Sequence, residues 1–265
     1  MGGSVTPGSG GGSGGRTTSV PGTGGRIAGT GGSGGSTSVP PNGPTVPPLT
    51  NGTSGRTTRY WDCCKPSCAW SSNASRSGMS SPATACAKDG TTVLGQNAGS
   101  ACGGGTAYQC NWGVPWAVSN TLSYGYAAFN GNNCGKCYQL DFTGGKVQGK
   151  SMIVQVINVG DMGAGTFDLL IPGGGVGANN ACTAGSNPQW GSGKNPGVRY
   201  GGFPSTCGSN MSCITSMCQA AFGNNSALMA GCDWYTGWFG GSSNPGVRYA
   251  QVSCPSAITS KSGMR

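Results

Sequence analysis

Fourteen cysteines lie between residues 63 and 254 of this 265-residue chain, and the first 55 residues contain none. Their number is even, their spacing is scattered and the chain has no His, so disulfides are favoured over metal sites. Because disulfides persist in oxidising compartments, we expect a secreted, extracellular protein with up to seven bridges. These bridges would fix the backbone of the folded part at many points, while their connectivity stays open at this level.

Composition divides the chain into two parts. Residues 1–55 consist almost entirely of Gly, Ser, Thr and Pro, with no aromatic residue and only two charges, Arg16 and Arg26. This stretch has too little apolar surface to offset its chain entropy, so we expect a disordered linker. Residues 56–265 then form one domain of ordinary size. Met1 is followed by Gly and Ser rather than by a basic and an apolar segment, so we expect a longer precursor.

The charge pattern argues against two classes of partner. The formal net charge is +9, but only 8% of the residues are charged and the basic residues are dispersed. Nucleic-acid binding needs clustered Lys and Arg, and a membrane helix needs a long apolar run; the sequence offers neither. A sparsely charged chain with aromatic residues suits a neutral polar partner such as a polysaccharide, and we expect a monomer.

Short β-rich segments separated by glycines predict an all-β domain. Residues 136–142 (KCYQLDF) and 151–159 (SMIVQVINV) are rich in β-branched and aromatic residues and would form a hairpin-like unit. Residues 166–171 (TFDLLI) predict another strand, and residues 213–231 predict one or two short helices broken at Gly223. Together these patterns favour an all-β barrel with long, bridged loops and a few short helices.

The hexapeptide NPGVRY occurs twice, at 195–200 and 244–249. Six residues without flanking similarity do not indicate a duplicated domain. We expect the same turn leading into a strand at both places.

The absence of both His and Glu narrows the possible chemistry. A Ser-His-Asp or Cys-His nucleophile system and a His-ligated metal are excluded. An acid–base mechanism would therefore draw on the six aspartates. These are Asp62, Asp89, Asp141, Asp161, Asp168 and Asp233.

The segment TTRYWDCCKPSCAW, residues 57–70, places one of these carboxylates among aromatic residues. Asp62 follows Tyr60 and Trp61, precedes three cysteines, and is followed eight residues later by Trp70. Bridged cysteines would hold the carboxylate rigidly, and aromatic faces can stack on pyranose rings. The pattern is typical of a sugar-cleaving site, although a single aromatic residue is more often part of a core.

Two other aspartates are candidates. Asp168 follows Phe167 in an apolar strand, where burial would raise its pKa and keep it protonated as a general acid; a water-facing strand edge is the alternative. Asp161 lies in the Gly-rich stretch VGDMGAG, where an Asp commonly caps a turn. Lys65 follows Asp62 closely and would favour the ionised form of that carboxyl if it reaches it.

The motif TRYWDCCKPSCAW resembles the signature of glycoside hydrolase family 45, a family of small secreted endoglucanases. The similarity continues through CAKDG (86–90), PWAVSNTLSYGYAA (115–128), FDLLIPGGGVG (167–177) and the terminal NPGVRYAQVSCP, and covers about residues 56–265. It implies a six-stranded double-psi β-barrel and an endo-β-1,4-glucanase that hydrolyses internal links of cellulose with inversion. It also implies cellulose and related β-1,4-glucans as partners, and no metal or organic cofactor.

The resemblance also implies roles for individual residues. Asp62 matches the general base that activates water, Asp168 the general acid that protonates the leaving oxygen, and Asp161 an assisting carboxylate on a mobile loop. Four residues match or adjoin substrate-binding positions: Tyr60, Lys65, Trp70 and Tyr200. The N-terminal linker would join such a domain to a cellulose-binding module outside this chain.

Departures and alternatives accompany this resemblance. Many relatives have His where this chain has Thr166, and Cys213 and Cys218 look like additions, so the bridge pattern is not transferred. Expansin-like proteins share the barrel without hydrolysing, but they lack the carboxylate that matches Asp62. A barwin-like sugar-binding module needs no catalytic pair. Release of reducing sugar from carboxymethyl cellulose separates an enzyme from both.

Overall fold

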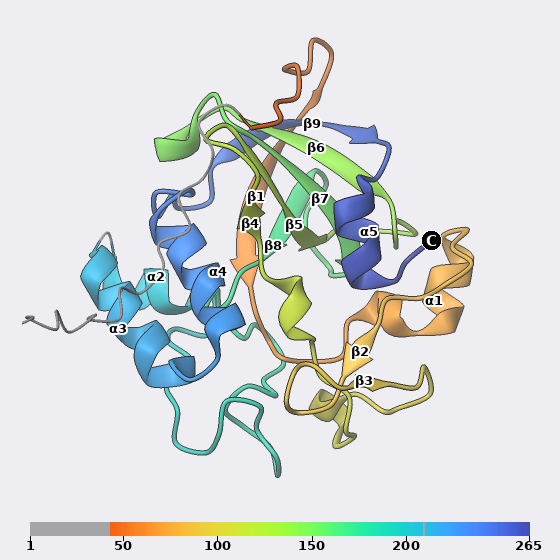
Figure 1. Ribbon diagram of the computed structural model, residues 1–265, viewed down its shortest axis with the longest axis vertical. Coiled ribbons are helices and arrows are strands. Elements are labelled where there is room, and N and C mark those ends of the chain that lie inside the picture. The colour runs from red at the N-terminus through yellow and green to blue at the C-terminus, as the bar shows by residue number, and fades with distance from the viewer. Residues whose placement is uncertain (1–42, 209) are drawn as a thin grey trace, which may run out of the picture. The chain divides into compact units, whose positions relative to one another are not determined.

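The computed structural model describes residues 43–208 and 210–265 (Figure 1). The strands are β1 (Thr53–Tyr60), β2 (Ala85–Cys86), β3 (Val93–Leu94), β4 (Trp116–Ala117), β5 (Leu122–Ala128), β6 (Cys137–Phe142), β7 (Ser151–Asn158), β8 (Thr166–Leu170) and β9 (Gly246–Val252). The helices are α1 (Ser71–Arg76), α2 (Gly202–Cys207), α3 (Met211–Phe222), α4 (Ser226–Thr236) and α5 (Ser256–Ser262). No described helix combines the length and the apolar character needed to cross a membrane.

Six strands close into a barrel. Their order is β5-β7-β6-β9-β1-β8, and β8 pairs back to β5 through Ala127↔Leu169 and Ala128↔Asp168. The pairs β5–β7 and β1–β8 are parallel, and the other neighbours are antiparallel. Closure gives each of these six strands a partner on both sides, which leaves no open barrel edge. The closed six-stranded barrel confirms the predicted fold class.

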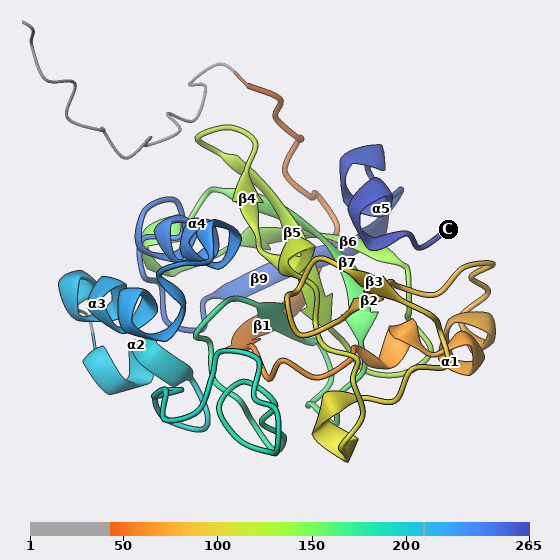
Figure 2. The same cartoon turned by 60° about the horizontal axis from the view of Figure 1, so that its bottom comes forward.

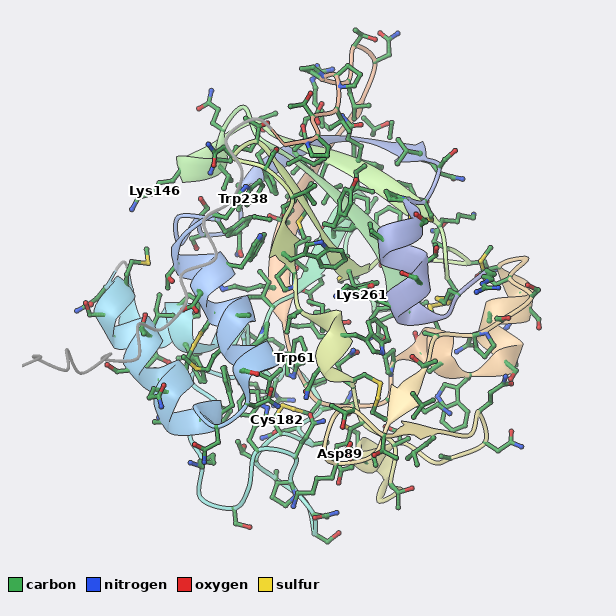
Figure 3. The ribbon with its side chains drawn as sticks, viewed as in Figure 1. Trp61, Asp89, Lys146, Cys182, Trp238 and Lys261 are labelled. Carbon is green, nitrogen blue, oxygen red and sulfur yellow. A yellow bond between two sulfur atoms is a disulfide. The ribbon has the colours of Figure 1, made fainter. Side chains whose placement is uncertain are left out.

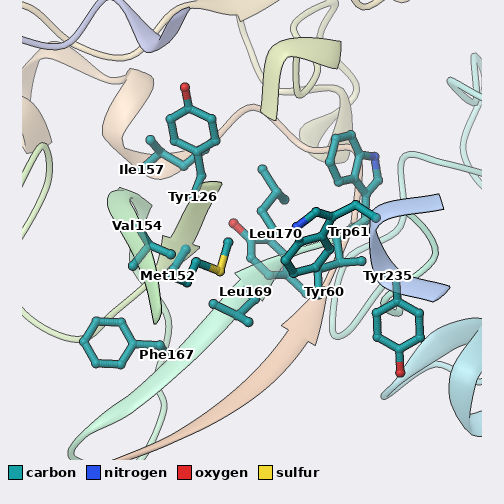
Figure 4. Packing of buried hydrophobic residues seen from close by; sticks show 14 of the residues in the cluster. Tyr60, Trp61, Tyr126, Met152, Val154, Ile157, Phe167, Leu169, Leu170 and Tyr235 are labelled. Atoms are coloured by element: carbon teal, nitrogen blue, oxygen red, sulfur yellow. The ribbon is translucent and has the colours of Figure 1, made fainter. Parts of the chain in front are cut away.

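Apolar side chains from the strands fill the barrel. β7 is buried from Ser151 to Ile157 because it lies between β5 and β6 and is covered on both faces. Figure 4 shows Met152 and Leu169 among the packed side chains. Phe167 on β8 stacks on Phe129, with ring centroids 4.2 Å apart. β8 is thus anchored in the core on both sides of Asp168.

The helices lie on opposite sides of the barrel. In both ribbon views α2, α3 and α4 cover one side, and α1 and α5 lie on the other (Figures 1 and 2). The Asn210 and Asn225 side chains cap α3 and α4 by accepting hydrogen bonds from the N–H groups of Cys213 and Leu228. Of the one or two short helices predicted to break at Gly223, the structure has two: α3 ends at Phe222 and α4 begins at Ser226.

All fourteen cysteines are paired, as predicted from their even number. The bridges that start in the segment after β1 tie it to three distant loops. Cys134 pairs with Cys68 and Cys137 pairs with Cys254, so both residues are structural half-cystines, as expected. The seven bridges are Cys63–Cys182, Cys64–Cys102, Cys68–Cys134, Cys86–Cys110, Cys137–Cys254, Cys207–Cys213 and Cys218–Cys232.

The predicted strands are present, but the repeated hexapeptide behaves differently at its two positions. β6 and β7 form the expected antiparallel unit, and β8 forms from the TFDLL residues. The second NPGVRY, at 244–249, enters β9 as expected. The first, at 195–200, does not enter a strand; Gly201 and Gly202 follow it with φ of 96° and 59° and turn the chain into α2. The prediction is wrong for that copy because the flanking glycines decide the path.

Ordered contacts begin before residue 56. Residues 1–42 of the predicted linker lie outside the described residues. The Leu49 N–H donates to the Asp141 carboxylate (2.5 Å), and the Gln139 amide donates to the carbonyl oxygen of Pro47 (2.9 Å). β1 itself begins at Thr53 and pairs with β9 from that residue. The last residues before the motif therefore contact the barrel.

Truncation at two points should separate these contacts from the rest of the N-terminal segment. A chain that starts at Gly43 is expected to melt at the same temperature as the full chain, because residues 1–42 contain few apolar residues and no aromatic one. A chain that starts at Thr53 loses the two hydrogen bonds and should melt about 3–8 °C lower. Calorimetry of the three proteins checks this, and equal melting temperatures for all of them would contradict it.

Candidate active site

A groove of about 860 Å³ is lined by the ends of β1 and β8 and by the surrounding loops. Six of the seven predicted site residues line it: Tyr60, Asp62, Lys65, Trp70, Asp168 and Tyr200. Asp161 does not line it, although its neighbours Gly160 and Met162 do. The fold thus brings together residues that lie more than one hundred positions apart in the sequence.

Backbone hydrogen bonds fix the chain on both sides of Asp62. The Trp61 N–H donates to the carbonyl oxygen of Gly175 (2.7 Å), and the Ala181 N–H donates to the carbonyl oxygen of Asp62 (2.9 Å). Trp61 itself is fully buried. The backbone that carries the Asp62 carboxylate is therefore held in place by two loops.

A strained turn follows Asp62 and supplies its hydrogen-bond donor. Cys63 has a φ of 62°, which is costly for a non-glycine residue, and its disulfide to Cys182 holds it there. Figure 3 labels Cys182 beside Trp61. The turn brings the Cys64 N–H to Oδ1 of Asp62 (2.9 Å). The cysteine cluster thus orients the carboxylate, as the sequence predicted.

Asp168 lies opposite Thr58 in the parallel register of β1 and β8. The Thr58 hydroxyl donates to Oδ1 of Asp168 (2.7 Å). On either side, Phe167 and Leu169 are buried, while Asp168 is half-buried and lines the groove. The carboxyl group therefore has apolar neighbours along its strand and an opening toward the groove.

Burial raises the pKa of both carboxyl groups to about 6. At Asp62 the hydrogen bond from Cys64 opposes this effect and the charge of Asp168 adds to it. At Asp168 the Thr58 hydroxyl and the charge of Arg59 oppose it. The predicted separation of the two pKa values is not found, because burial dominates at both.

Lys65 forms its hydrogen bonds away from Asp62, so the condition under which it would favour the ionised form of that carboxyl is not met. Its ammonium group donates to the carbonyl oxygens of Gln96 (2.5 Å) and Ala98 (3.0 Å). It lies 3.4 Å from the centroid of the Trp70 ring. Buried at 4% exposure, Lys65 secures the Trp70 side of the groove instead of adjusting the charge of Asp62.

The three predicted aromatic residues differ in exposure. Tyr60 is buried, and its hydroxyl has no hydrogen-bond partner among the described residues. Burial and the charges of Asp62 and Asp168 raise the pKa of that hydroxyl above its ordinary value. Trp70 is half-buried, and Tyr200 is 67% exposed. Trp70 and Tyr200 are therefore the accessible flat surfaces of the groove.

Asp161 is exposed on the loop between β7 and β8. Asn130 holds this loop through both backbone groups of Met162: its amide donates to the Met162 carbonyl, and it accepts from the Met162 N–H (3.1 Å). The Ser67 hydroxyl accepts from the N–H of Val159 (2.7 Å). The loop is tied at these points, and in this conformation Asp161 stays outside the groove.

The other three aspartates have positions away from the groove. Asp89, labelled in Figure 3, lies in an exposed turn, where hydrogen bonds from the Thr92 hydroxyl and from the backbone N–H groups of Thr91 and Thr92 hold its pKa at about 2. Asp141 accepts from the Ser151 hydroxyl (2.7 Å) within the sheet. Asp233 is exposed on α4. Of the six aspartates, only Asp62 and Asp168 line the groove.

Comparison with known proteins identifies the family of this chain. A sequence model described as glycosyl hydrolase family 45 matches residues 54–265. The chain belongs to glycosyl hydrolase family 45. The resemblance read from the YWDCC motif is thereby confirmed.

Relatives in this family come from distant organisms. "Endoglucanase B" of Cellvibrio japonicus is 43% identical over 245 residues, which are 83% of this chain and 47% of that protein. "Endoglucanase" of Cryptopygus antarcticus is 42% identical over 222 residues, 81% of this chain and 89% of that protein. This chain thus spans about half the length of the Cellvibrio relative. The crystal structure of a cellulase from the Antarctic springtail, Cryptopygus antarcticus, superposes with a TM-score of 0.68 at 41% identity, covering 82% of this chain and 98% of that one.

Sequence reasoning on this family 45 chain missed three residues of the groove. The Thr58 hydroxyl donates a hydrogen bond to Asp168, and Arg59 is the next residue of β1 after Thr58. Asn158, at the end of β7, accepts a hydrogen bond from the Ser67 N–H (2.9 Å). Thr58 and Arg59 stand within the TTRYWD motif, so their proximity to Asp62 in sequence was the available signal. Among the described residues, no three Cys or Asp side chains come together as a metal ion would require.

Proposed function

We propose that this chain is a secreted endo-β-1,4-glucanase that hydrolyses internal bonds of cellulose or related β-glucans with inversion. The observation that carries the proposal is the pair of half-buried carboxyl groups, Asp62 and Asp168, on one open groove of a family 45 chain. The accessible Trp70 and Tyr200 supply flat surfaces for pyranose rings, and an open groove accepts the middle of a long chain. The seven disulfides support an extracellular location.

The hydrogen-bond partners favour Asp62 as the base and Asp168 as the acid. The partner of Asp62 is a backbone N–H, which can only donate and therefore favours the ionised carboxylate. The partner of Asp168 is the Thr58 hydroxyl, which can rotate and accept when that carboxyl carries a proton. The pair can thus hold one proton on Asp168 while Asp62 stays ionised.

The proposed reaction is a single displacement. Asp62 takes a proton from a water molecule while the oxygen of that water attacks the anomeric carbon from the face opposite the leaving group. The glycosidic C–O bond breaks, and the leaving oxygen takes the proton of Asp168. The water needs room between base and sugar, so we expect the two carboxyl groups to lie about 6.5–9.5 Å apart. Asp161, on its loop, would assist from the edge of the groove.

Two measurements on the native protein test this proposal. Carboxymethyl cellulose should release reducing ends with a rapid fall in viscosity, since internal cleavage shortens the chains early. Proton NMR of fresh cello-oligosaccharide hydrolysate should show the α-anomer first, because inversion at a β-link gives that product. An initial β-anomer would indicate retention, and the absence of any sugar release would remove the enzyme assignment.

A further inference from the structure

Arg59 is a buried cation whose hydrogen-bond partners are all neutral. Its side chain is 8% exposed at the groove, on β1 next to the residue that bonds Asp168. Nε donates to the carbonyl oxygen of Gly201 (3.1 Å), Nη1 to Oδ1 of Asn244 (2.9 Å) and Nη2 to Oγ of Ser205 (3.2 Å). Burying a guanidinium without a carboxylate partner is costly, so its position calls for a reason other than stability.

The three acceptors belong to segments that are far apart in sequence. Gly201 directly follows the first NPGVRY, and Asn244 begins the second. Ser205 lies in α2, which starts just after Gly201. The guanidinium thus joins the turn that follows the first copy and the first residue of the second copy to β1.

The turn after Tyr200 packs closely on Arg59. A Cβ added at Gly201 would lie 3.3 Å from Nη2 of Arg59. Tyr200 is the most exposed aromatic surface of the groove and immediately precedes this turn. We propose that Arg59 is a positioning residue, whose forked guanidinium sets the Tyr200 wall of the groove relative to Asp168. This inference rests on the proposed glucanase function.

The same cation faces the titratable groups of the site. Asp168 on β8 feels its charge, as does Tyr235 on α4, whose ring centroid lies 6.0 Å from Cζ of Arg59. Asp62, Lys65 and Arg199 are the other charged residues that line the groove. A positive charge favours the ionised form of Asp168 and so lowers its pKa. Without this charge, Asp168 would keep its proton to a higher pH.

Two substitutions of Arg59 separate the effect of its three hydrogen bonds from the effect of its positive charge. Arg59→Lys keeps the cation but cannot span three acceptors from one ammonium. We expect its KM for cellohexaose to rise about tenfold, with the pH profile unchanged. Arg59→Met should show the same KM rise, and the high-pH limb of kcat/KM, which reports the acid, should move up by about 0.5 pH unit or more. Arg248→Lys is the matched control: it is exposed, donates to Gly52 and should behave as the native protein.

A further variant and a second readout keep the test decisive. If Arg59→Met does not fold, the double variant Ser205→Ala/Asn244→Ala removes two of the three hydrogen bonds of Arg59 and keeps its positive charge. This variant should show the KM rise without the shift of the pH profile. Carbon-13 NMR titration of the Asp168 carboxyl in the Arg59 variants reports the charge effect without any turnover. Native KM in both Arg59→Lys and the double variant would overturn the inference. A native protein that releases no sugar would instead contradict the proposed function.

Discussion

Replacing Asp168 with Asn is expected to lower turnover on cello-oligosaccharides by about 10²–10⁴-fold, because in the proposed mechanism this carboxyl protonates the leaving oxygen. Substrates with an activated leaving group need little protonation and should be spared. Asp62→Asn should depress both kinds of substrate alike, since each requires attack by water. Asp161→Asn should cost less than either, because its side chain lies outside the groove. Steady-state kinetics on cellohexaose and on an activated aryl cellobioside measure these differences.

Asp233→Asn is the matched control for these substitutions, since Asp233 is exposed on α4 away from the groove. It should retain native kinetics on both substrates. Near-native turnover of Asp62→Asn, together with loss of activity in Asp89→Asn or Asp141→Asn, would refute the assignment.

The inactive variants are also expected to be more stable at neutral pH. Burial holds the pKa of each carboxyl at about 6 in the folded chain, well above its unfolded value. Between about pH 4 and 6 the unfolded chain has released protons that the folded chain retains, so stability falls as the pH rises through this window. Asp62→Asn or Asp168→Asn removes that penalty and should add on the order of 1–2 kcal/mol at pH 7, and nothing at pH 3. Urea unfolding at both pH values measures it, with Asp233→Asn unchanged.

Removing the Cys63–Cys182 bridge is expected to cost about 5 kcal/mol of unfolding free energy, together with most of the activity. The two cysteines are 119 residues apart, and a bridge that closes a long loop restricts the unfolded chain strongly. The bridge also holds the left-handed backbone at Cys63 that brings the Cys64 N–H to Asp62. The test compares Cys63→Ala/Cys182→Ala with the native protein by urea unfolding without reductant and by turnover.

The Cys207–Cys213 bridge supplies a control, because it spans only six residues and lies at the α2–α3 junction. Cys207→Ala/Cys213→Ala should cost about 2 kcal/mol and keep activity. Equal losses of stability and activity in the two double variants would contradict a specific role for the bridge at Cys63.

Much of the candidate site could be predicted from the sequence because few residues in this chain can perform acid–base chemistry. Six aspartates and no His or Glu left few candidates, and the aromatic and cysteine neighbours of Asp62 marked it out. The β6–β7 unit and β8 were readable because β-branched runs there are interrupted by glycine. The family resemblance then supplied the strand number and topology of the barrel, which local patterns alone could not specify.

What escaped prediction depends on contacts between distant segments. The parallel register that sets Thr58 against Asp168 joins residues 110 positions apart and leaves no local signal. Lys65 is three residues from Asp62, yet the carbonyl groups of Gln96 and Ala98 capture it. The pKa values of both carboxyl groups are raised because the fold buries each of them, which composition does not reveal.

The pairing of β1 with β8 has a consequence for how such enzymes diversify. Asp168 lies within β8, and Asp62 follows the end of β1, so the barrel register governs the spacing of the two carboxyl groups. Trp70 and Tyr200, by contrast, stand in connecting segments outside the strands. Insertions or deletions in those segments can change the polysaccharide-binding surface without altering the distance between the two carboxyl groups. Substrate range and reaction stereochemistry can therefore change independently in descendants of this scaffold.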